Sequence, residues 1–401
     1  MERRFFVARD EEIRQGKTTD IYFERTRRIL EQLDDHTRVY AEFTASSLPD
    51  GYEWAVFVGL EEALRLLEGL PVDVYALPEG TVFRNRDHTD VPVPVMAIEG
   101  EYRAFAVYET PILGFLCQSS GVATRAARIK RLAGEVPVLS FGIRRMHPAL
   151  APVIDRSAFI GGCDGVSSIL GAETIGRRPQ GTMPHALIIV LGETEAWKAF
   201  DRLMPPEVPR IALIDTYGDE KQKALEAAET IPNLKAVRLD TPGSRRGDFA
   251  RIVREVRWEL DIRGYRHVEV FVSGGLSEKN IRRLKEAGAR GFGVGTSISN
   301  APTIDFAMDI VAIGTQPVAK KGKFGGRKQV YRCEECLVYQ VEPEPRDAAE
   351  PPACPRCGAP MNPVLQKVMD QGRRLVPERP VEEIRRYVLD QIFKLPEPEV
   401  A

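Results

Sequence analysis

The chain has 401 residues, of which 43% are hydrophobic and 28% charged, and its formal net charge at pH 7 is −2. This composition is typical of a globular protein with at least one large core. The small net charge argues against broad electrostatic binding of nucleic acid or anionic membranes. No stretch is apolar over the ~18 residues that a membrane-spanning helix requires, and the charged N-terminus lacks the apolar core of a signal peptide, so we expect a cytoplasmic protein.

The first part of the chain mixes helical and extended periods. Two segments space apolar residues at helical intervals: 21–33 and 54–67. Three segments bounded by Pro or Gly predict strands: 72–77, 93–98 and 104–108. We therefore expect an N-terminal α+β domain over residues 1–115, with a helix over 111–130 at its end.

From residue 136 onward, short apolar runs alternate with amphipathic segments of helix length. Six runs predict buried strands: 138–141, 158–160, 211–214, 236–239, 268–272 and 291–294. Three segments between them predict helices: 219–230, 247–263 and 277–287. This alternation predicts a parallel α/β sheet. The alternation leaves this sheet, over residues 116–318, either open or closed. Because eight strands cannot be counted cleanly, a TIM-like barrel here would be irregular.

A loop rich in Gly or polar residues follows each of these predicted strands: 142–145, 161–164, 215–217, 240–243, 273–275 and 295–297. In a barrel of this kind the active site is built at the carboxyl ends of the strands. The same placement after six strands predicts that the loops converge on one pocket.

Two of these loops suit a phosphate. Ser273, Gly274 and Gly275 lie between a predicted strand and helix, and Gly293, Gly295 and Thr296 repeat the arrangement at the next strand. Small residues let backbone N–H groups approach an anion, and late barrel loops bind phosphate in such folds. The alternative is that these glycines only form tight turns.

Two further groups of residues suggest binding chemistry. Asp215, Arg238 and Asp240, with His185, could hold Mg²⁺ or a ribose hydroxyl, or could instead form helix caps and ion pairs. A lone histidine is more often structural than catalytic. Phe141 beside Arg144 and Arg145 suits a flat aromatic acid, or could be a core ring next to surface arginines.

The cysteines near the C-terminus predict a metal site. Cys333 and Cys336 form one C-x-x-C pair, and Cys354 and Cys357 form a second pair after 17 intervening residues. This spacing is typical of four thiolates around a structural Zn²⁺ in a reducing compartment, against an alternative of buried or redox thiols. We expect a zinc module over 319–365 and a C-terminal helical segment over 366–401.

In order along the chain, seven motifs resemble those of nicotinate and nicotinamide phosphoribosyltransferases. They are T-T-D-I-Y at 18–22, F-G-I-R-R at 141–145, G-T-M-P-H at 181–185, L-I-D-T-Y at 213–217, V-R-L-D at 237–240, S-G-G-L at 273–276 and F-G-V-G-T-S at 292–297. The four-cysteine module resembles the archaeal-type nicotinate enzymes. The resemblance implies that nicotinate and phosphoribosyl pyrophosphate form nicotinate mononucleotide and pyrophosphate in NAD biosynthesis.

The resemblance also implies residue roles. ATP hydrolysis would be coupled through phosphorylated His185, and Phe141 would stack on the pyridine ring. Tyr22 would cover the other face from across a dimer interface, so we expect a homodimer or larger oligomer with a shared active site.

The resemblance also implies roles for the arginines, the aspartates and the glycine loops. Arg144, with Arg145, and Arg238 would hold the carboxylate, ribose or phosphate. Asp215 and Asp240 would serve Mg²⁺, pyrophosphate or ribose, and the two glycine loops would hold the 5′-phosphate.

Substrate choice has alternatives. Asp164 resembles an acidic residue that nicotinamide-using relatives employ for the carboxamide, and its charge would repel nicotinate unless Arg144 or Arg145 compensates. Quinolinate, with two carboxylates, is a further candidate that would favour a denser cluster of Lys and Arg. A different class of protein, a zinc-ribbon nucleic-acid binder with an inactive barrel, is disfavoured by the small net charge and the acidic segment 341–352.

Overall fold

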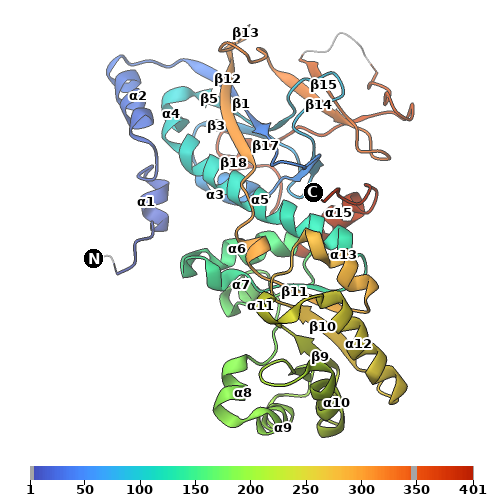
Figure 1. The fold of residues 1–401 in the computed structure, drawn as a ribbon. Helices are drawn as coiled ribbons and strands as arrows, with labels where there is room; N and C mark the ends of the chain where they lie inside the picture. The colour runs from blue at the N-terminus through green and yellow to red at the C-terminus, as the bar shows by residue number, and fades with distance from the viewer. Residues whose placement is uncertain (1–3, 345–349, 401) are drawn as a thin grey trace. The chain divides into compact units, whose positions relative to one another are not determined.

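The computed structural model describes residues 4–344 and 350–400 and divides into two compact units. Unit 1 comprises Met1–Thr124 and Pro302–Pro396, and unit 2 comprises Arg125–Ala301 and Glu397–Ala401. Figure 1 follows the chain through both units. The division differs from the predicted domains, because the segment after residue 302 returns to unit 1. None of the helices among the described residues combines the length and apolar character needed to span a bilayer.

Unit 1 is built on a seven-stranded sheet in the order β13-β12-β1-β5-β3-β17-β18 with antiparallel neighbours throughout. Its strands are β1 (Arg38–Ser47), β3 (Val72–Ala76), β5 (Pro94–Glu101), β12 (Asp305–Ile313), β13 (Gln316–Pro317), β17 (Gln366–Asp370) and β18 (Arg373–Arg374). Phe43, Met96 and Phe306 from three of these strands belong to one buried apolar core. The N-terminal mixed domain is therefore confirmed, and its sheet also includes strands from the C-terminal part of the chain.

Helices and two small sheets complete unit 1. The helices are α1 (Asp10–Arg14), α2 (Ile21–Gln32), α3 (Leu60–Leu67), α4 (Tyr102–Phe105), the 3-10 helix η1 (Ala106–Tyr108), the start of α5 (Glu109–Ala133) and α15 (Val381–Ile392). The small sheets pair β2 (Ala55–Val56) with β4 (Val82–Phe83), and β14 (Lys328–Arg332) with β15 (Tyr339–Pro343) and β16 (Asn362–Pro363).

The structure corrects three expectations for unit 1. The predicted strand 104–108 is wrong, because these residues form α4 and η1. The predicted helix 54–67 exists only over Leu60–Leu67, after strand β2. The central strand β1 was missed, although apolar residues at 39, 41, 43 and 45 alternate with Tyr40, Glu42 and Thr44, and the structure buries both sets. Its neighbour β12 pairs with it, Phe43 opposite Met308, so residues 305–313 belong to this sheet.

Unit 2 contains a six-stranded sheet in the order β7-β6-β11-β10-β9-β8, and every neighbouring pair is parallel. The strands are β6 (Val138–Ser140), β7 (Gly165–Val166), β8 (Ile211–Leu213), β9 (Ala236–Leu239), β10 (Glu269–Ser273) and β11 (Gly291–Val294). From β8 the order follows the chain to β11 and then returns to β6 and β7. The order is therefore cyclic, with the hydrogen-bonded ladder open between β7 and β8. The predicted mixed α/β fold with a parallel sheet is confirmed.

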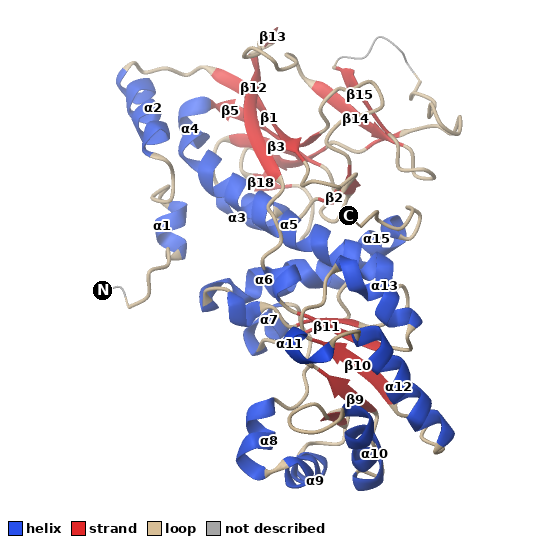
Figure 2. Cartoon of the chain, in the orientation of Figure 1, coloured by secondary structure: helices blue, strands red, loops and turns tan. Residues whose placement is uncertain are grey.

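Helices connect these strands, and Figure 2 shows α10, α12 and α13 alongside β9, β10 and β11. The helices of unit 2 are η2 (Ile143–Arg145), η3 (Pro148–Leu150), α6 (Ala151–Ile160), α7 (Ile169–Thr174), α8 (His185–Leu191), α9 (Glu193–Leu203), α10 (Glu220–Thr230), α11 (Gly243–Arg246), α12 (Phe249–Ile262), α13 (Glu278–Glu286) and α14 (Thr296–Ser299). Local caps fix several helix starts, since Asp219 accepts from two backbone N–H groups of α10 and Ser277 forms a capping box on α13.

One predicted strand of unit 2 is wrong. Residues 158–160 are the last turn of α6, and the strand is instead β7, five residues later. A three-residue apolar run has no period that separates a strand from a buried helix turn. The consequence concerns the loop 161–164, which precedes β7 and so lies at the amino end of the sheet rather than at its carboxyl end.

Candidate active site

Loops after β6, β9, β10 and β11 line one cavity of about 390 Å³ within unit 2. Because the strands are parallel, these loops leave the same edge of the sheet. The cavity brings together eleven residues predicted from the sequence: Phe141, Arg144, Arg145, Arg238, Asp240, Ser273, Gly274, Gly275, Gly293, Gly295 and Thr296. The convergence that the sequence predicted for these loops is therefore present in the structure.

The loop after β10 has the backbone shape that needs glycine. Gly274 and Gly275 have φ values of +83° and +65°, in the left-handed region. A Cβ on Gly274 would lie 2.7 Å from Asp240 Oδ1, and the Gly274 carbonyl accepts a hydrogen bond from Arg246 Nη1 at 2.7 Å. The loop therefore presents backbone close to a guanidinium at the start of α13, an arrangement suited to an anion.

Phe141 is held at the cavity wall from both sides. Its backbone N–H donates to Val294 O at 2.8 Å, and its ring lies 6.1 Å from the Phe271 ring, centre to centre. A Cβ on Gly293 would lie 2.4 Å from the Phe141 ring, so only glycine leaves room for the ring there. Arg144 and Arg145 follow on η2, which places guanidinium groups beside an aromatic face.

His185 begins α8 and faces two carboxylates. Its Nε2 lies 3.6 Å from Asp240 Oδ2 and 3.9 Å from Asp215 Oδ1, while Nδ1 lies 3.0 Å from Thr216 Oγ1. The sequence motif G-T-M-P-H and the loops after β8 and β9 therefore meet in space. The imidazole is about one-third exposed, so a reactant can reach it.

Asp215 is the most deeply buried of these acids, with 1% of its side chain exposed. Its Oδ2 accepts from the Asp240 backbone N–H at 2.6 Å and from Thr241 Oγ1 at 3.1 Å. Burial raises the pKa of the Asp215 carboxyl. The backbone hydrogen bond from Asp240 opposes that rise, and so does the electrostatic effect of the nearby His185. Asp215 therefore has the contacts of a positioning residue for Asp240 and His185.

Arg238 and Ser273 fix the second acid. Ser273 Oγ donates to Asp240 Oδ1 at 2.9 Å, and Arg238 Nη2 lies 3.5 Å from Asp240 Oδ2. Arg238 also donates to Thr182 Oγ1 and to Met183 O, which ties the loop before His185 to strand β9. Asp240, with 28% of its side chain exposed, is the more accessible of the two carboxylates.

Two predicted binding residues are not part of this group. Asp164 precedes β7, and its Oδ2 accepts from Val138 N–H at 2.8 Å and pairs with Lys130 Nζ at 2.9 Å. Val138 begins β6, so Asp164 lies at the opposite end of that strand from Phe141, and the expectation that it contacts substrate is corrected. Tyr22 belongs to unit 1, where it is exposed on α2.

The structure adds Arg246 to the cavity wall, beside Thr241, Pro242 and Gly243 of the loop 240–243. Arg246 was missed because residues 244–246 show no strand or helix period that would place them. The available signal was the Arg245-Arg246 pair after a Pro-Gly turn, directly beyond a loop already expected to be functional.

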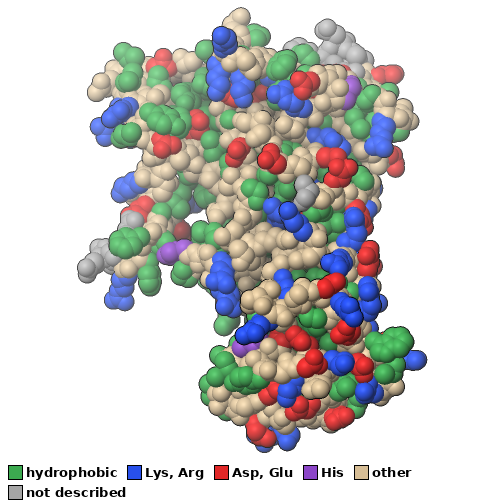
Figure 3. Space-filling model, viewed as in Figure 1, with side chains coloured by type: hydrophobic (Ala, Val, Ile, Leu, Met, Phe, Trp, Pro, Cys, Tyr) green, Lys and Arg blue, Asp and Glu red, His purple; other side chains and the backbone are tan. Residues whose placement is uncertain are grey.

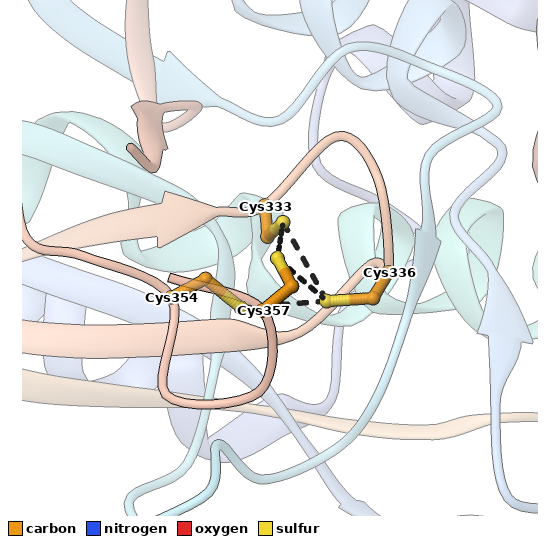
Figure 4. A group of neighbouring side chains, drawn as sticks. All are labelled: Cys333, Cys336, Cys354 and Cys357. Carbon is orange, nitrogen blue, oxygen red and sulfur yellow. Dashed lines mark hydrogen bonds between the residues drawn. The ribbon is translucent and has the colours of Figure 1, made fainter. Parts of the chain in front are cut away.

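The four cysteines predicted to bind metal lie together in unit 1 (Figure 4). Their sulfur atoms all lie within 4.8 Å of one another, with Cys336–Cys354 at 3.3 Å, Cys333–Cys357 at 3.5 Å and Cys336–Cys357 at 3.8 Å. A tetrahedral zinc with Zn–S bonds of about 2.3 Å needs sulfurs about 3.8 Å apart. The residues present therefore fit such an ion.

Two family models together match most of the chain. Residues 20–120 match the family model described as quinolinate phosphoribosyl transferase, N-terminal domain, and residues 122–309 match the corresponding C-terminal domain. The nicotinate phosphoribosyltransferase pncB2 of Mycobacterium tuberculosis is 32% identical over 363 residues, covering 84% of this chain and 72% of that protein. The nicotinate phosphoribosyltransferase of Bacillus subtilis is 28% identical, covering 71% and 66%.

Solved structures give the same picture. A nicotinate-nucleotide pyrophosphorylase from Pyrococcus furiosus is 52% identical and superposes with a TM-score of 0.93, covering 98% of this chain and all of that one. Human nicotinic acid phosphoribosyltransferase superposes with a TM-score of 0.73 over 94% of each chain at 19% identity, which is a likeness of fold.

Proposed function

The chain belongs to the nicotinate phosphoribosyltransferase family, and we propose that it catalyses phosphoribosyl transfer in the cavity of unit 2. It is an enzyme of NAD biosynthesis that joins nicotinate to phosphoribosyl pyrophosphate, giving nicotinate mononucleotide and pyrophosphate. The resemblance carried by the seven sequence motifs is thus confirmed. The observation that carries the assignment of the site is the meeting of Phe141, Asp240 and two glycine loops around one cavity.

The 5′-phosphate of the sugar would lie against the glycine loops. Gly274 and Gly275 let the backbone approach closely, and Arg246 adds a guanidinium held by Gly274 O. Gly295 and Thr296, at the start of α14, supply the second loop. Backbone N–H groups together with a guanidinium are a strong combination for a phosphate.

Nicotinate would stack on the exposed face of Phe141, with its carboxylate directed to Arg144 or Arg145. The partner's Tyr22 would cover the other face, which requires a homodimer or a larger assembly. The ring nitrogen is unprotonated at neutral pH, so the nucleophile needs orientation more than a base. Fixing the ring against Phe141 supplies that orientation.

The departing pyrophosphate needs positive charge as its bond to C1′ breaks. Arg238 lines the cavity, and Asp240 is the acid that would hold Mg²⁺ on the diphosphate. Asp215 would act through Asp240 and His185, because its oxygens are turned toward them and not toward solvent.

His185 would couple ATP hydrolysis to synthesis. When Nδ1–H donates to Thr216, the Nε2 lone pair becomes the nucleophile. It would take the γ-phosphoryl group of ATP and release ADP, and water would later cleave the N–P bond to give inorganic phosphate. Asp240 and Asp215, within 4 Å of Nε2, would stabilise the imidazolium state between these events.

We also propose what the six-stranded sheet of unit 2 and the four-cysteine cluster are. The cyclic order of six parallel strands supports an irregular TIM-like barrel open between β7 and β8. The four clustered sulfurs support a structural zinc module, in which all ligand positions are filled by protein.

Quinolinate is the second candidate substrate, because the matching family model carries its name and four arginines line the cavity. Side-by-side assays with nicotinate, nicotinamide and quinolinate, each with phosphoribosyl pyrophosphate and Mg²⁺, separate the three. We expect turnover of nicotinate with release of pyrophosphate. Turnover of quinolinate or nicotinamide without any of nicotinate would reject the proposal.

The face seen in Figure 3 does not favour nucleic-acid binding as an alternative function. Basic and acidic side chains are interspersed on the face seen in Figure 3. Binding of nucleic acid would instead require a continuous basic surface.

A further inference from the structure

A second large cavity, of about 670 Å³, lies entirely within unit 1 beside the four-cysteine site. Its volume falls in the range of small-molecule sites, about 300–1,000 Å³. The proposed transferase reaction does not use it. Its walls come from four separate stretches of chain: the segment after β4, the two cysteine turns, and the residues that follow α15.

The charges on the wall are mainly positive. Arg84, Arg86, Arg356 and Lys394 line the cavity, against the acids Asp87 and Glu335. Asp87 is buried and already accepts from its own turn and from the neighbouring strand: its Oδ1 from the N–H groups of residues 89 and 91, and its Oδ2 from that of residue 341 at 2.8 Å. The four cations therefore face the cavity with one exposed acid, Glu335, among them.

These cations are weakly paired. Arg84 and Arg86 each lie near one carboxylate, at 3.8 Å and 3.5 Å, and both pairs are largely exposed, so these ion pairs have little energetic value. Arg86 Nη1 also donates to the Asp90 carbonyl at 2.7 Å, which leaves its charge without a close counter-charge. Lys394 Nζ donates to a backbone carbonyl, that of residue 334, at 2.8 Å. Within the described part of the chain, no carboxylate lies in ion-pair range of Arg356. The charge of these side chains is thus available to an anion.

The remaining wall suits an organic molecule. His88 Nδ1 lies 3.1 Å from Tyr339 O, which fixes the ring and leaves Nε2 as its second polar atom. Val338, Leu395 and Pro396 add apolar groups to the wall. A wall that offers both cations and apolar groups matches a molecule that carries phosphate groups and a ring.

We propose that this cavity binds a small molecule with two or more phosphate groups, of the size of a nucleoside di- or triphosphate, at a site separate from the reaction. The concave shape favours a small ligand over a nucleic-acid strand. Cys336 and Cys357 also line the cavity, so the bound ligand covers two of the four sulfurs. The site thereby links ligand binding to the chemical accessibility of the cysteine module.

The test uses a non-hydrolysable ATP analogue and equilibrium dialysis on the full chain. The double variant Arg356→Ala/Lys394→Ala should bind one equivalent per chain fewer than the wild type, since removing each charge-assisted hydrogen bond weakens binding on the order of tenfold. Transferase activity and metal content should stay unchanged. The matched control is Arg373→Ala, which removes an exposed charge of β18 away from the cavity and should bind as the wild type does.

Two further measurements distinguish loss of binding from misfolding of the first variant. Arg84→Ala/Arg86→Ala changes a different wall and should show the same loss. The analogue should also slow the reaction of Cys336 and Cys357 with a thiol reagent in the wild type but not in either double variant. Equal stoichiometry in all proteins would overturn the proposal. So would loss of metal from the variants, because the cations would then serve the thiolates, or binding of an oligonucleotide in place of the analogue.

Discussion

Replacing Gly293 by alanine tests directly whether Phe141 carries the pyridine ring. Gly293 lies in β11 with a backbone conformation open to any residue, so the substitution adds one methyl group and no backbone strain. That methyl would lie 2.4 Å from the Phe141 ring, whereas carbon atoms in contact stay about 3.5 Å apart. The ring must therefore retreat by roughly 1 Å.

A displacement of this size affects activity more than stability. Misplacing a reacting group by about 1 Å can lower the rate about a hundredfold, close to 2.7 kcal/mol of transition-state stabilisation. Overpacking in a core costs about 1–3 kcal/mol, and the low end applies here because the half-buried Phe141 ring can move toward the cavity. We expect kcat/KM for nicotinate to fall about a hundredfold, with only a few degrees lost in Tm.

The assay is steady-state synthesis of nicotinate mononucleotide, run beside thermal denaturation. The matched control is Gly243→Ala, in the same cavity wall, where a Cβ meets nothing within 4 Å. It should keep nearly full activity. Equal kinetics for Gly293→Ala and the wild type, or equal loss in both variants, would refute a role for the Phe141 ring in placing the substrate.

Three further outcomes are expected. His185→Ala should abolish stimulation by ATP while retaining some ATP-independent synthesis, and retained coupling would falsify the phosphohistidine. Metal analysis should find about one zinc per chain, with Cys354→Ser losing activity mainly by unfolding, and a stable metal-free protein would contradict this. Glu42, buried 2.7 Å from Lys328 Nζ, has its pKa raised by burial to about 7. Between about pH 4.5 and 7 the folded chain therefore holds a proton that the unfolded chain has lost, and the free energy of unfolding falls as pH rises, by up to ~3 kcal/mol. Urea denaturation at pH 5 and 8 should show a smaller fall for Glu42→Gln, and an identical fall would exclude Glu42 as its source.

Local patterns predicted the parts of the fold whose period is unambiguous. Helices α10, α12 and α13 and strands β8 to β11 lie where the sequence placed them, since each is long enough, or flanked clearly enough, to show its type. The failures at 104–108 and 158–160 are short apolar runs, which helices and strands share. Strand β1 could have been identified, because its apolar residues at 39, 41, 43 and 45 recur with the period of a strand.

Some residues of the candidate site could likewise be predicted from local patterns, and others could not. Glycines at 274, 275 and 293 could be identified in advance, because loops between strand and helix constrain residue size wherever they occur. The pairing of His185 with Asp215 and Asp240 could not be derived from spacing alone, since it joins segments up to 55 residues apart. Resemblance to a family placed these residues together, and the structure supplied the distances.

The sequence by itself determined the kind of chemistry, because phosphate-sized loops, an aromatic ring beside guanidinium groups and two C-x-x-C pairs are local features. Only the tertiary structure decided which of these groups meet. In the structure, Asp164 lies at the far end of β6, Arg246 donates to the loop expected to bind phosphate, and β12 pairs with β1. Contacts between distant segments depend on strand order and on which end of a strand a loop leaves, and neither is encoded in any short stretch of residues.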